Sequence, residues 1–354
     1  MRGLRSVAGI VGKASRQLSM FNGSGVIGRV IARSADAVEE NKDVLQNLPD
    51  KKAAAYLDHL KFLRPGGFEG IEDVADVSHE NLVKYADIVD NVPDNDWSLA
   101  DEEELLKKVD GLNFELRHGS RVPDLIVDSG FIKSRAALRN SLGNVPGLMK
   151  KTGDETYHYE DFVFFNIKGL PVGAKVEPQK GVFKFPFDSG ISSESCMFLK
   201  DCFSLIPEHI VGKKSSYPGS PSVKSFNGVS CYLETDQGKF RFKVIEDGEV
   251  SHVTDFVDKK EQFFFGDDVK NAISLTAFMY SKIFGREFLL AKNDKEFAKE
   301  VTDLAGFECR IPREISLDKG VHCYEPGKSM SAEDGKRLVR EASQEVDYYN
   351  GNVY

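Results

Sequence analysis

The sequence is poor in the residues that small secreted or metal-stabilised domains depend on. It has five cysteines in 354 residues, an odd number, and they lack the tight paired spacing of a zinc site or of a disulfide framework. We therefore expect reduced thiols and no bound metal. The cysteines are Cys196, Cys202, Cys231, Cys309 and Cys323.

Long apolar runs and an excess of positive charge are also missing. No run approaches the roughly 18 apolar residues of a membrane-spanning helix, so we expect no membrane span. Lys and Arg number 47 against 56 Asp and Glu, a formal net charge of −9. Because phosphate contacts need Lys and Arg, this balance disfavours a nucleic-acid partner. A Walker A loop is excluded as well, since Gly-Lys-Ser at 327–329 lacks the required spacing.

Residues 1–35 have a composition unlike the rest of the chain. They hold six Arg or Lys residues and no Asp or Glu, and they are rich in Ser, Gly and Val. Without a long apolar stretch, they do not form an ordinary cleaved secretory signal. Three interpretations remain, namely the unstructured export signal of a bacterial effector, an organelle transit peptide, or a plain disordered tail. The hydrophobic content of 41% is enough for a sizeable core and about two domains.

The next segment, residues 36–110, has the pattern of a helical region. Apolar residues recur at helical spacing within 51–62, 81–89 and 99–109. Ser98 and Asp101 form a capping box at the start of the last of these helices. Nothing in this segment predicts catalysis, and we expect Trp97 to anchor the helical layer to the domain that follows.

A histidine at the end of a strand begins the domain that carries the candidate chemistry. The strand covers 113–117 and ends in His118-Gly119-Ser120. Pro123 then stands at a typical first helical position, and Gly130 ends the short apolar helix. A histidine therefore lies beside a flexible backbone, although His-Gly-Ser by itself is also common in turns.

Two further segments stand out downstream. The run Phe-Val-Phe-Phe-Asn-Ile at 162–167 is a continuous series of strand-forming residues, which is typical of a strand buried on both faces. Asp267 is a good cap for a helix over 268–284, and 293–296 caps the next helix. Glu308 follows directly, with alternating apolar residues after it.

The three segments, in this order, resemble the conserved segments of the ADP-ribosyltransferases of the His-Tyr-Glu branch, which contains the diphtheria-like toxins and the poly-ADP-ribose polymerases. The resemblance covers roughly residues 111–325. It implies an α+β fold with a split β-sheet core over 111–354, after a disordered segment at 1–35 and a helical region at 36–110. The short strands and turns of 182–258 exceed what a compact core needs, so we expect an insertion there that contacts the substrate protein.

The resemblance also implies roles for individual residues. Glu308 is the catalytic glutamate that stabilises positive charge on the ribose, with Glu314 as the fallback. His118 holds the adenosine-side ribose, and the Gly119 backbone approaches the carboxamide. Ser120 and Arg121 reach the ribose or the diphosphate, Arg121 through charge-assisted hydrogen bonds.

The aromatic residue that stacks on nicotinamide is matched to Phe164, with Phe165 and Tyr159 as neighbours. The family has a tyrosine here. A phenylalanine keeps the π-face for stacking and lacks the hydroxyl hydrogen bond.

The function that follows is NAD-dependent mono-ADP-ribosylation of a host protein, ubiquitin being one candidate, by a secreted monomeric bacterial effector that acts in the host cytoplasm. NAD is the substrate, and no metal is needed. The acceptor residue is left open. One alternative is an RNA 2′-phosphotransferase or DNA-modifying enzyme on the same fold, and another is a non-catalytic effector that binds a host protein. A third is a cysteine protease that pairs Cys196 or Cys202 with His209 or His252.

Overall fold

The computed structural model describes residues 25–63, 69–93, 97–120, 123–142, 160–179, 182–199, 223–236, 239–304 and 306–322. Helices and strands are mixed along this part of the chain, and the sheets are antiparallel in every pair, which confirms the α+β class.

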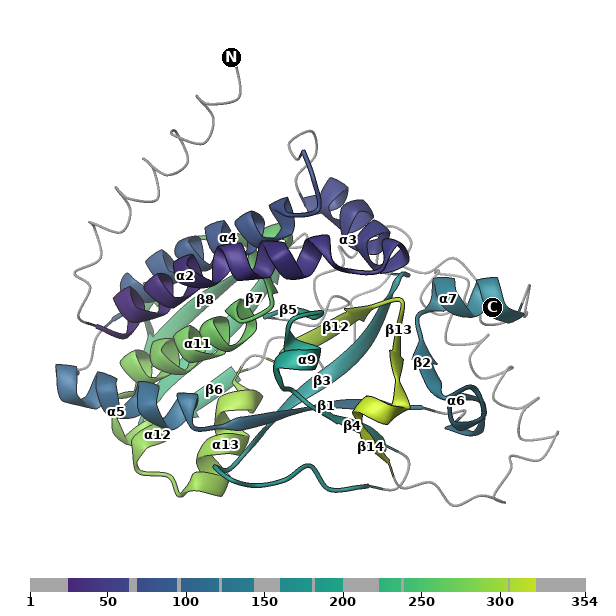
Figure 1. Cartoon of the computed structure of the whole chain (residues 1–354). Helices are drawn as coiled ribbons and strands as arrows, with labels where there is room; N and C mark the ends of the chain where they lie inside the picture. Colours follow the sequence, from purple (N-terminus) through teal and green to yellow (C-terminus); the bar gives the residue numbers. More distant parts are fainter. Residues whose placement is uncertain are drawn as a thin grey trace, which may run out of the picture.

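A seven-stranded sheet forms the centre of the molecule (Figure 1). Its strand order is β11-β5-β12-β3-β1-β4-β14. In chain order the strands are β1 (Asn113–Gly119), β3 (Phe162–Leu170), β4 (Val182–Pro186), β5 (Cys196–Phe198), β11 (Phe263–Phe265), β12 (Glu308–Pro312) and β14 (Val321–His322). The three segments singled out in the sequence therefore lie on three adjacent strands, β1, β3 and β12.

The two faces of this sheet differ in chemistry. Successive residues of a strand point to opposite faces, so one face of β1 carries Phe114 and Leu116 and the other carries Glu115 and Arg117. We call the first the core face and the second the polar face. On the core face the sheet packs against α11 (Asp268–Phe284) and α13 (Asp294–Asp303).

The exposure of β3 corrects the expectation of a strand buried on both faces. Val163, Phe165 and Ile167 are buried on the core face, whereas Phe164 is half-buried and Asn166 is exposed on the polar face. Asn166 interrupts the apolar run at the position where the polar face opens to solvent.

The N-terminal helices are α2 (Val26–Gln46), α3 (Asp50–Leu63), α4 (Asp73–Asp90) and α5 (Leu99–Asp110). The structure confirms the helical region and the capping box of Ser98 and Asp101. Residues 26–35 were expected to be unstructured, and this is corrected, because α2 buries its first turns against α4 and α11 (Figure 1). Trp97 anchors the layer, donating its indole N–H to the carbonyl of Ser281 at 2.9 Å.

Helix α3 covers part of the polar face. Tyr56 and Leu60 join Phe198 and Phe263 in an apolar cluster. The Tyr56 ring also packs edge-on against the Phe162 ring, with 5.4 Å between the ring centroids. The cluster covers β11 and β5 and extends across β12 to Phe162 at the start of β3. The helical region is therefore part of the same folded body as the sheet.

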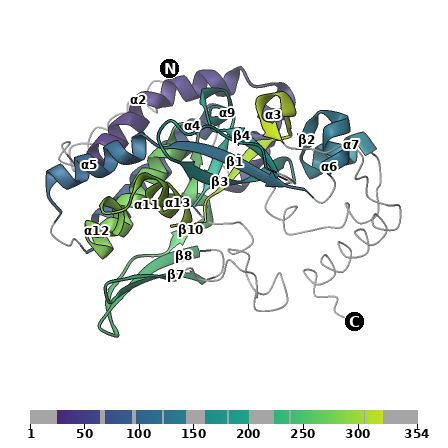
Figure 2. The same ribbon diagram turned by 90° about the horizontal axis from the view of Figure 1, so that it is seen from below.

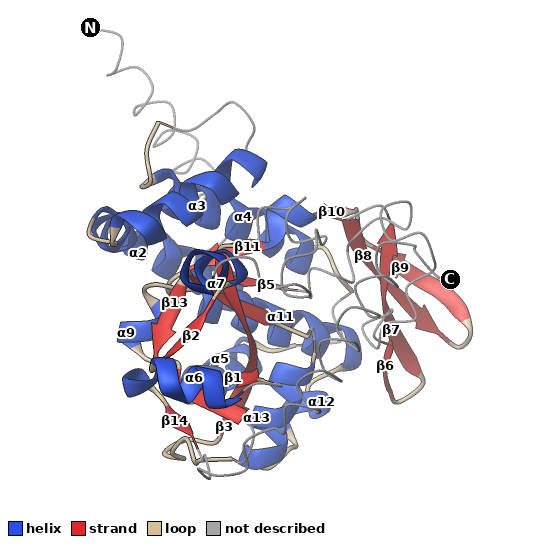
Figure 3. Cartoon of the chain, turned by 90° about the vertical axis from the view of Figure 1, so that its right-hand side faces the viewer, coloured by secondary structure: helices blue, strands red, loops and turns tan. Residues whose placement is uncertain are grey.

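A second sheet stands at one side of the molecule (Figures 2 and 3). It consists of β6 (Val223–Phe226), β7 (Val229–Asp236), β8 (Lys239–Glu246), β9 (Glu249–Val253) and β10 (Val257–Asp258). Strands β7 and β8 pair antiparallel as a hairpin. The insertion was expected over 182–258, but β4 and β5 belong to the central sheet, so the separate sheet begins only at Val223.

A small sheet joins the segment after β1 to the segment after β12. It pairs β2 (Phe131–Lys133) with β13 (Glu314–Ser316). Arg313 makes the turn out of β12 with φ of 64°, and its side chain pairs with Asp161. The short helices are α6 (Pro123–Ser129), α7 (Arg135–Leu142), α9 (Ser189–Ser192), α12 (Glu287–Leu290), η2 (Lys259–Gln262) and η3 (Leu317–Lys319). Gly130, with φ of 72°, ends α6 as expected.

Candidate functional site

One cross-strand row places polar side chains from four strands together on the polar face. From β5 to β4 the row consists of Phe198, Glu308, Asn166, Arg117 and Lys184. Residues directly opposite each other in antiparallel strands share a face. We call Glu308, Asn166, Arg117 and Lys184 the polar row. Two strand spacings separate Glu308 from Arg117, roughly 9 to 10 Å.

The adjoining row on the same face supplies an aromatic ring and an open stretch of backbone. Phe164 lies opposite Arg310, and Gly119 lies two residues along β1 from Arg117. A Cβ atom at Gly119 would meet nothing within 4 Å. The face therefore offers a half-buried ring and accessible backbone next to the polar row.

Arg310 holds the Glu308 carboxylate in place. Its Nε donates to Glu308 Oε1 at 2.7 Å, and its Nη2 donates to the same oxygen. The Arg310 side chain is fully buried, with its guanidinium carbon 4.1 Å from the ring centroid of Phe198 and 5.1 Å from that of Phe164. Glu308 itself is 13% exposed. A rigid, permanently charged group thus fixes a carboxylate that solvent still reaches.

His118 lies on the other face of the sheet from Glu308. It is paired with Phe183 across β4, and its ring centroid lies 5.6 Å from that of Phe165. Nδ1 is 3.0 Å from the carbonyl oxygen of Phe164, which can only accept, so Nδ1 carries the proton. Burial lowers the pKa of His118, and the hydrogen bond to Phe164 offsets only part of that effect.

The structure thus sorts the predicted site residues by face. Glu308, Phe164 and Gly119 come together on the polar face. His118 and Phe165 do not join them, because Phe165 is 2% exposed and packs edge-on against Phe185 in the core.

The remaining predicted residues lie elsewhere or outside the description. Ser120 follows the end of β1, and Glu314 lies in the small sheet opposite Lys133, away from the polar row. Arg121 and Tyr159 lie outside the described residues.

Arg117 is the functional candidate that the sequence prediction missed. It stands between Asn166 and Lys184 in the polar row, and its side chain is 34% exposed. A signal was present, because Glu115 and Arg117 alternate with the apolar Phe114 and Leu116 in a predicted strand. The sequence prediction named His118, the next residue along the strand, whose side chain lies on the other face.

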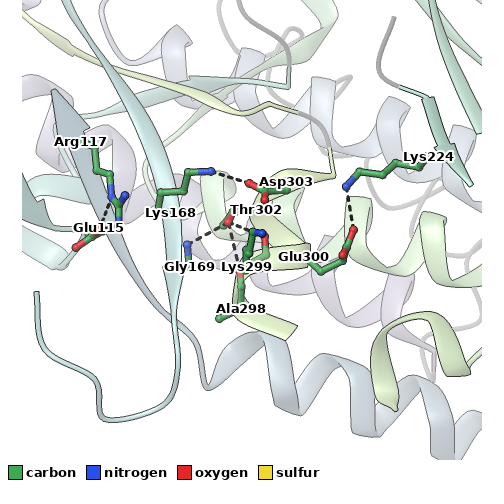
Figure 4. A network of polar contacts seen from close by, with 10 residues as sticks. All are labelled: Glu115, Arg117, Lys168, Gly169, Lys224, Ala298, Lys299, Glu300, Thr302 and Asp303. Atoms are coloured by element: carbon green, nitrogen blue, oxygen red, sulfur yellow. Dashed lines mark hydrogen bonds and ion pairs between the residues drawn. The ribbon is translucent and has the colours of Figure 1, made fainter. Parts of the chain in front are cut away.

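Further charged contacts hold the strands and α13 together beneath this face (Figure 4). Lys168 on β3 pairs with Asp303 at 2.6 Å, and the Thr302 hydroxyl accepts from the Gly169 N–H at 3.3 Å. A Cβ atom at Gly169 would lie 2.4 Å from the Ala298 carbonyl oxygen. Only glycine permits this close approach, which sets where the chain enters β12 at Glu308.

The cysteine protease alternative finds no support at Cys196. Its side chain is fully buried in β5, and burial raises the pKa of the thiol to about 12. His252 lies in β9, in the other sheet, so the two do not form a pair. Cys202 and His209 fall outside the described residues.

Within the described ranges, no group of three or more His, Cys, Asp or Glu side chains is arranged to hold a metal ion. A search of the same ranges finds no helix that is both long and apolar enough to cross a membrane.

Comparison with known proteins adds no identification to this geometry. No protein-family model matches the chain, and no curated protein matches it in a sequence search.

Proposed function

We propose that the protein is an NAD-dependent mono-ADP-ribosyltransferase that binds its dinucleotide on the polar face. One observation carries the proposal: Glu308, Asn166 and Arg117 share one row across β12, β3 and β1, the strands that carry the three family-like segments. The resemblance rests on the order of these segments along the chain. Their adjacency in the sheet is independent support.

Glu308 is the proposed catalytic residue. When the bond between nicotinamide and ribose breaks, the electron pair leaves with nicotinamide and positive charge develops on the sugar. A fixed carboxylate beside the ribose stabilises that charge, and a nucleophile of the acceptor protein then bonds to the same carbon and loses its proton. The contacts from Arg310 keep the Glu308 carboxylate oriented before the ligand arrives.

Arg117 is the proposed anion contact among the described residues. The diphosphate of NAD is negatively charged, and a guanidinium binds phosphate oxygens through charge-assisted hydrogen bonds. Arg117 is one third exposed and lies two strands from Glu308.

Phe164 and Gly119 supply the apolar part of this site. The ring of Phe164 is half-buried beside Arg310, and the open backbone at Gly119 lets a planar carboxamide approach. His118 acts from the core face of the sheet, because its hydrogen bond to the Phe164 carbonyl connects β1 to β3 beside the Phe164 ring. We therefore assign His118 a positioning role in place of ligand contact.

The acceptor is proposed to be a host protein, with ubiquitin as one candidate, and the chain to act as a secreted effector in the host cytoplasm. The second sheet is the proposed contact for the acceptor, since β6 is tied to α13 by the ion pair of Lys224 and Glu300 at 2.9 Å (Figure 4). Net charge −9 disfavours a nucleic-acid acceptor.

The proposal is tested by incubating the full chain with labelled NAD and a host-cell lysate, beside Glu308→Gln. We expect label on a discrete protein band, and we expect Glu308→Gln to lower kcat by about 100-fold to 1,000-fold with the fold retained in circular dichroism. Glu314→Gln, which changes the fallback carboxylate outside the polar row, is expected to keep wild-type turnover.

A wild-type chain that neither cleaves NAD nor labels a protein would contradict the proposal and leave a binding effector as the better interpretation. Equal turnover in Glu308→Gln and wild type would reject only the assignment of Glu308 as the catalytic residue.

A further inference from the structure

A buried carboxylate lies behind Arg117 on the polar face. Glu115 is 1% exposed, and its Oε1 accepts a hydrogen bond from Nε of Arg117 and is ion-paired with Nη2 of the same side chain (Figure 4). The ammonium of Lys184 stands 3.6 Å from the same oxygen, on a side chain that is 9% exposed. Two strands, β1 and β4, thus bring two cations to one anion.

The charges of this cluster do not cancel. Glu115 contributes one negative charge, and Arg117 and Lys184 contribute one positive charge each. A buried carboxylate needs a partner, and Lys184 is the more buried of the two cations. With Lys184 compensating Glu115, the positive charge of Arg117 is left for a ligand.

The geometry also leaves part of the guanidinium available. The contacts to Glu115 use the Nε and Nη2 groups of Arg117, and a guanidinium carries five N–H donors in a rigid plane. Among the described residues, none makes a hydrogen bond or ion pair with Nη1, which is therefore available to an anion, on a side chain one third exposed to solvent.

We propose that Glu115 and Lys184 form a positioning pair that presents Arg117 to a phosphate-type anion on the polar face. Glu115 fixes the plane of the guanidinium. Lys184 compensates the negative charge of Glu115, which would otherwise neutralise the positive charge of Arg117. Holding a flexible side chain in its binding geometry lowers the entropy lost when the ligand binds. The inference deepens the proposed function, on which it rests for the location of the diphosphate.

The test uses inorganic pyrophosphate as the probe and isothermal titration calorimetry of the full chain. Glu115→Gln combined with Lys184→Met removes both buried charges and keeps the net charge of the cluster at +1. No uncompensated buried charge remains in this double variant, so it is expected to fold. We expect its affinity for pyrophosphate to fall about tenfold, which corresponds to about 1.4 kcal/mol.

Two further variants separate positioning from charge. Lys184→Met alone leaves a cluster of net charge zero and is expected to weaken pyrophosphate binding by more than the double variant does. In an Arg117→Lys background the double substitution is expected to have no further effect, because an ammonium has no plane to orient.

A second measurement follows the Nε–H resonance of Arg117 by NMR, assigned with Arg117→Lys. We expect it to be protected from water exchange in the wild type and unprotected in the double variant. Wild-type affinity for pyrophosphate in the double variant would overturn the proposal, as would a wild-type chain that binds no pyrophosphate.

The outcome is distinguishable from failure of the proposed function. If pyrophosphate binding responds to the variants as predicted but the chain does not turn over NAD, the transferase proposal is rejected and the positioning pair is supported. Turnover that depends on Glu308, with pyrophosphate binding insensitive to the double substitution, would reject the positioning pair alone.

Discussion

At the scale of single residues, the site depends on how buried charges are paired. Arg310 is fully buried and forms an ion pair with Glu308, while Glu115 is buried and forms an ion pair with Arg117. In both cases the more deeply buried partner holds the one that solvent reaches. The polar face therefore combines rigid charges with access for a ligand.

Removing Arg310 is expected to cost both stability and turnover. Arg310→Met leaves the Glu308 carboxylate without its cation, which we expect to lower the free energy of unfolding by about 3 to 5 kcal/mol. Urea unfolding measures it. The double variant Glu308→Gln with Arg310→Met should lose less than the sum of the two single losses, whereas strict additivity would show that the pair is not coupled.

The pH dependence of stability should contain a contribution from His118. Burial lowers its pKa in the folded state, so below the unfolded value of about 6.5 the unfolded chain takes up a proton that the folded chain does not. The free energy of unfolding therefore falls as pH falls below that value and is retained above it.

This is checked with His118→Gln by urea unfolding between pH 7.5 and pH 5. The difference in stability between wild type and variant should shrink toward low pH, by no more than about 1.4 kcal/mol per pH unit. His79 and His252, whose pKa values are also lowered by burial, remain in both proteins and cancel in this difference. A difference that does not change with pH would contradict the assignment.

At the scale of elements, the position of β12 depends on α13 lying against β3. The helix ends at Asp303, and only a few residues later the chain enters β12 at Glu308. Gly169 lets the helix backbone approach, and the capping of α13 by the side chain of Asn293 fixes where the helix starts.

Gly169→Ala is expected to lower the free energy of unfolding by about 1 to 3 kcal/mol, because the new methyl group would overlap the Ala298 carbonyl. Turnover should fall with it, since a displaced α13 moves Glu308. For the unfolding measurement alone, Gly119→Ala is the matched control in a neighbouring strand, where a methyl group meets only open space. Similar thermal unfolding temperatures for the two variants would show that α13 does not need this close approach.

At the scale of the whole molecule, the helical layer and the central sheet share one core. Val30 and Ile31 of α2 belong to the same buried cluster as Phe165 and Ile311 of the sheet. Trp97, the single tryptophan of the chain, lies where this layer meets α11. It therefore reports on their association.

We expect one cooperative unfolding transition, seen at the same urea concentration by Trp97 fluorescence and by far-ultraviolet circular dichroism. Ile31→Ala should shift both signals together by about 2 to 5 kcal/mol, because the side chain is 1% exposed. Ala32→Ser, on the exposed side of the same turn, should shift neither. Separate transitions for the two signals would show that the helices form an independent domain.

The sequence by itself determined the local features of this protein. Strand β1, the short helix closed by Gly130, the capping box at Ser98 and the start of β12 at Glu308 all follow from residue patterns within a few positions of one another. These features depend on backbone preferences and side-chain periodicity, which a single segment carries.

Only the tertiary structure decided which of these residues meet. Strand register places Arg117 in the row of Glu308 and sends His118 to the core, and one position along a strand reverses the face. In the same way, residues 26–35 belong to the basic, acid-free segment 1–35, yet they form a helix because α4 and α11 offer a surface to bury their apolar side. Both outcomes depend on contacts between segments far apart in the chain, which no local pattern contains.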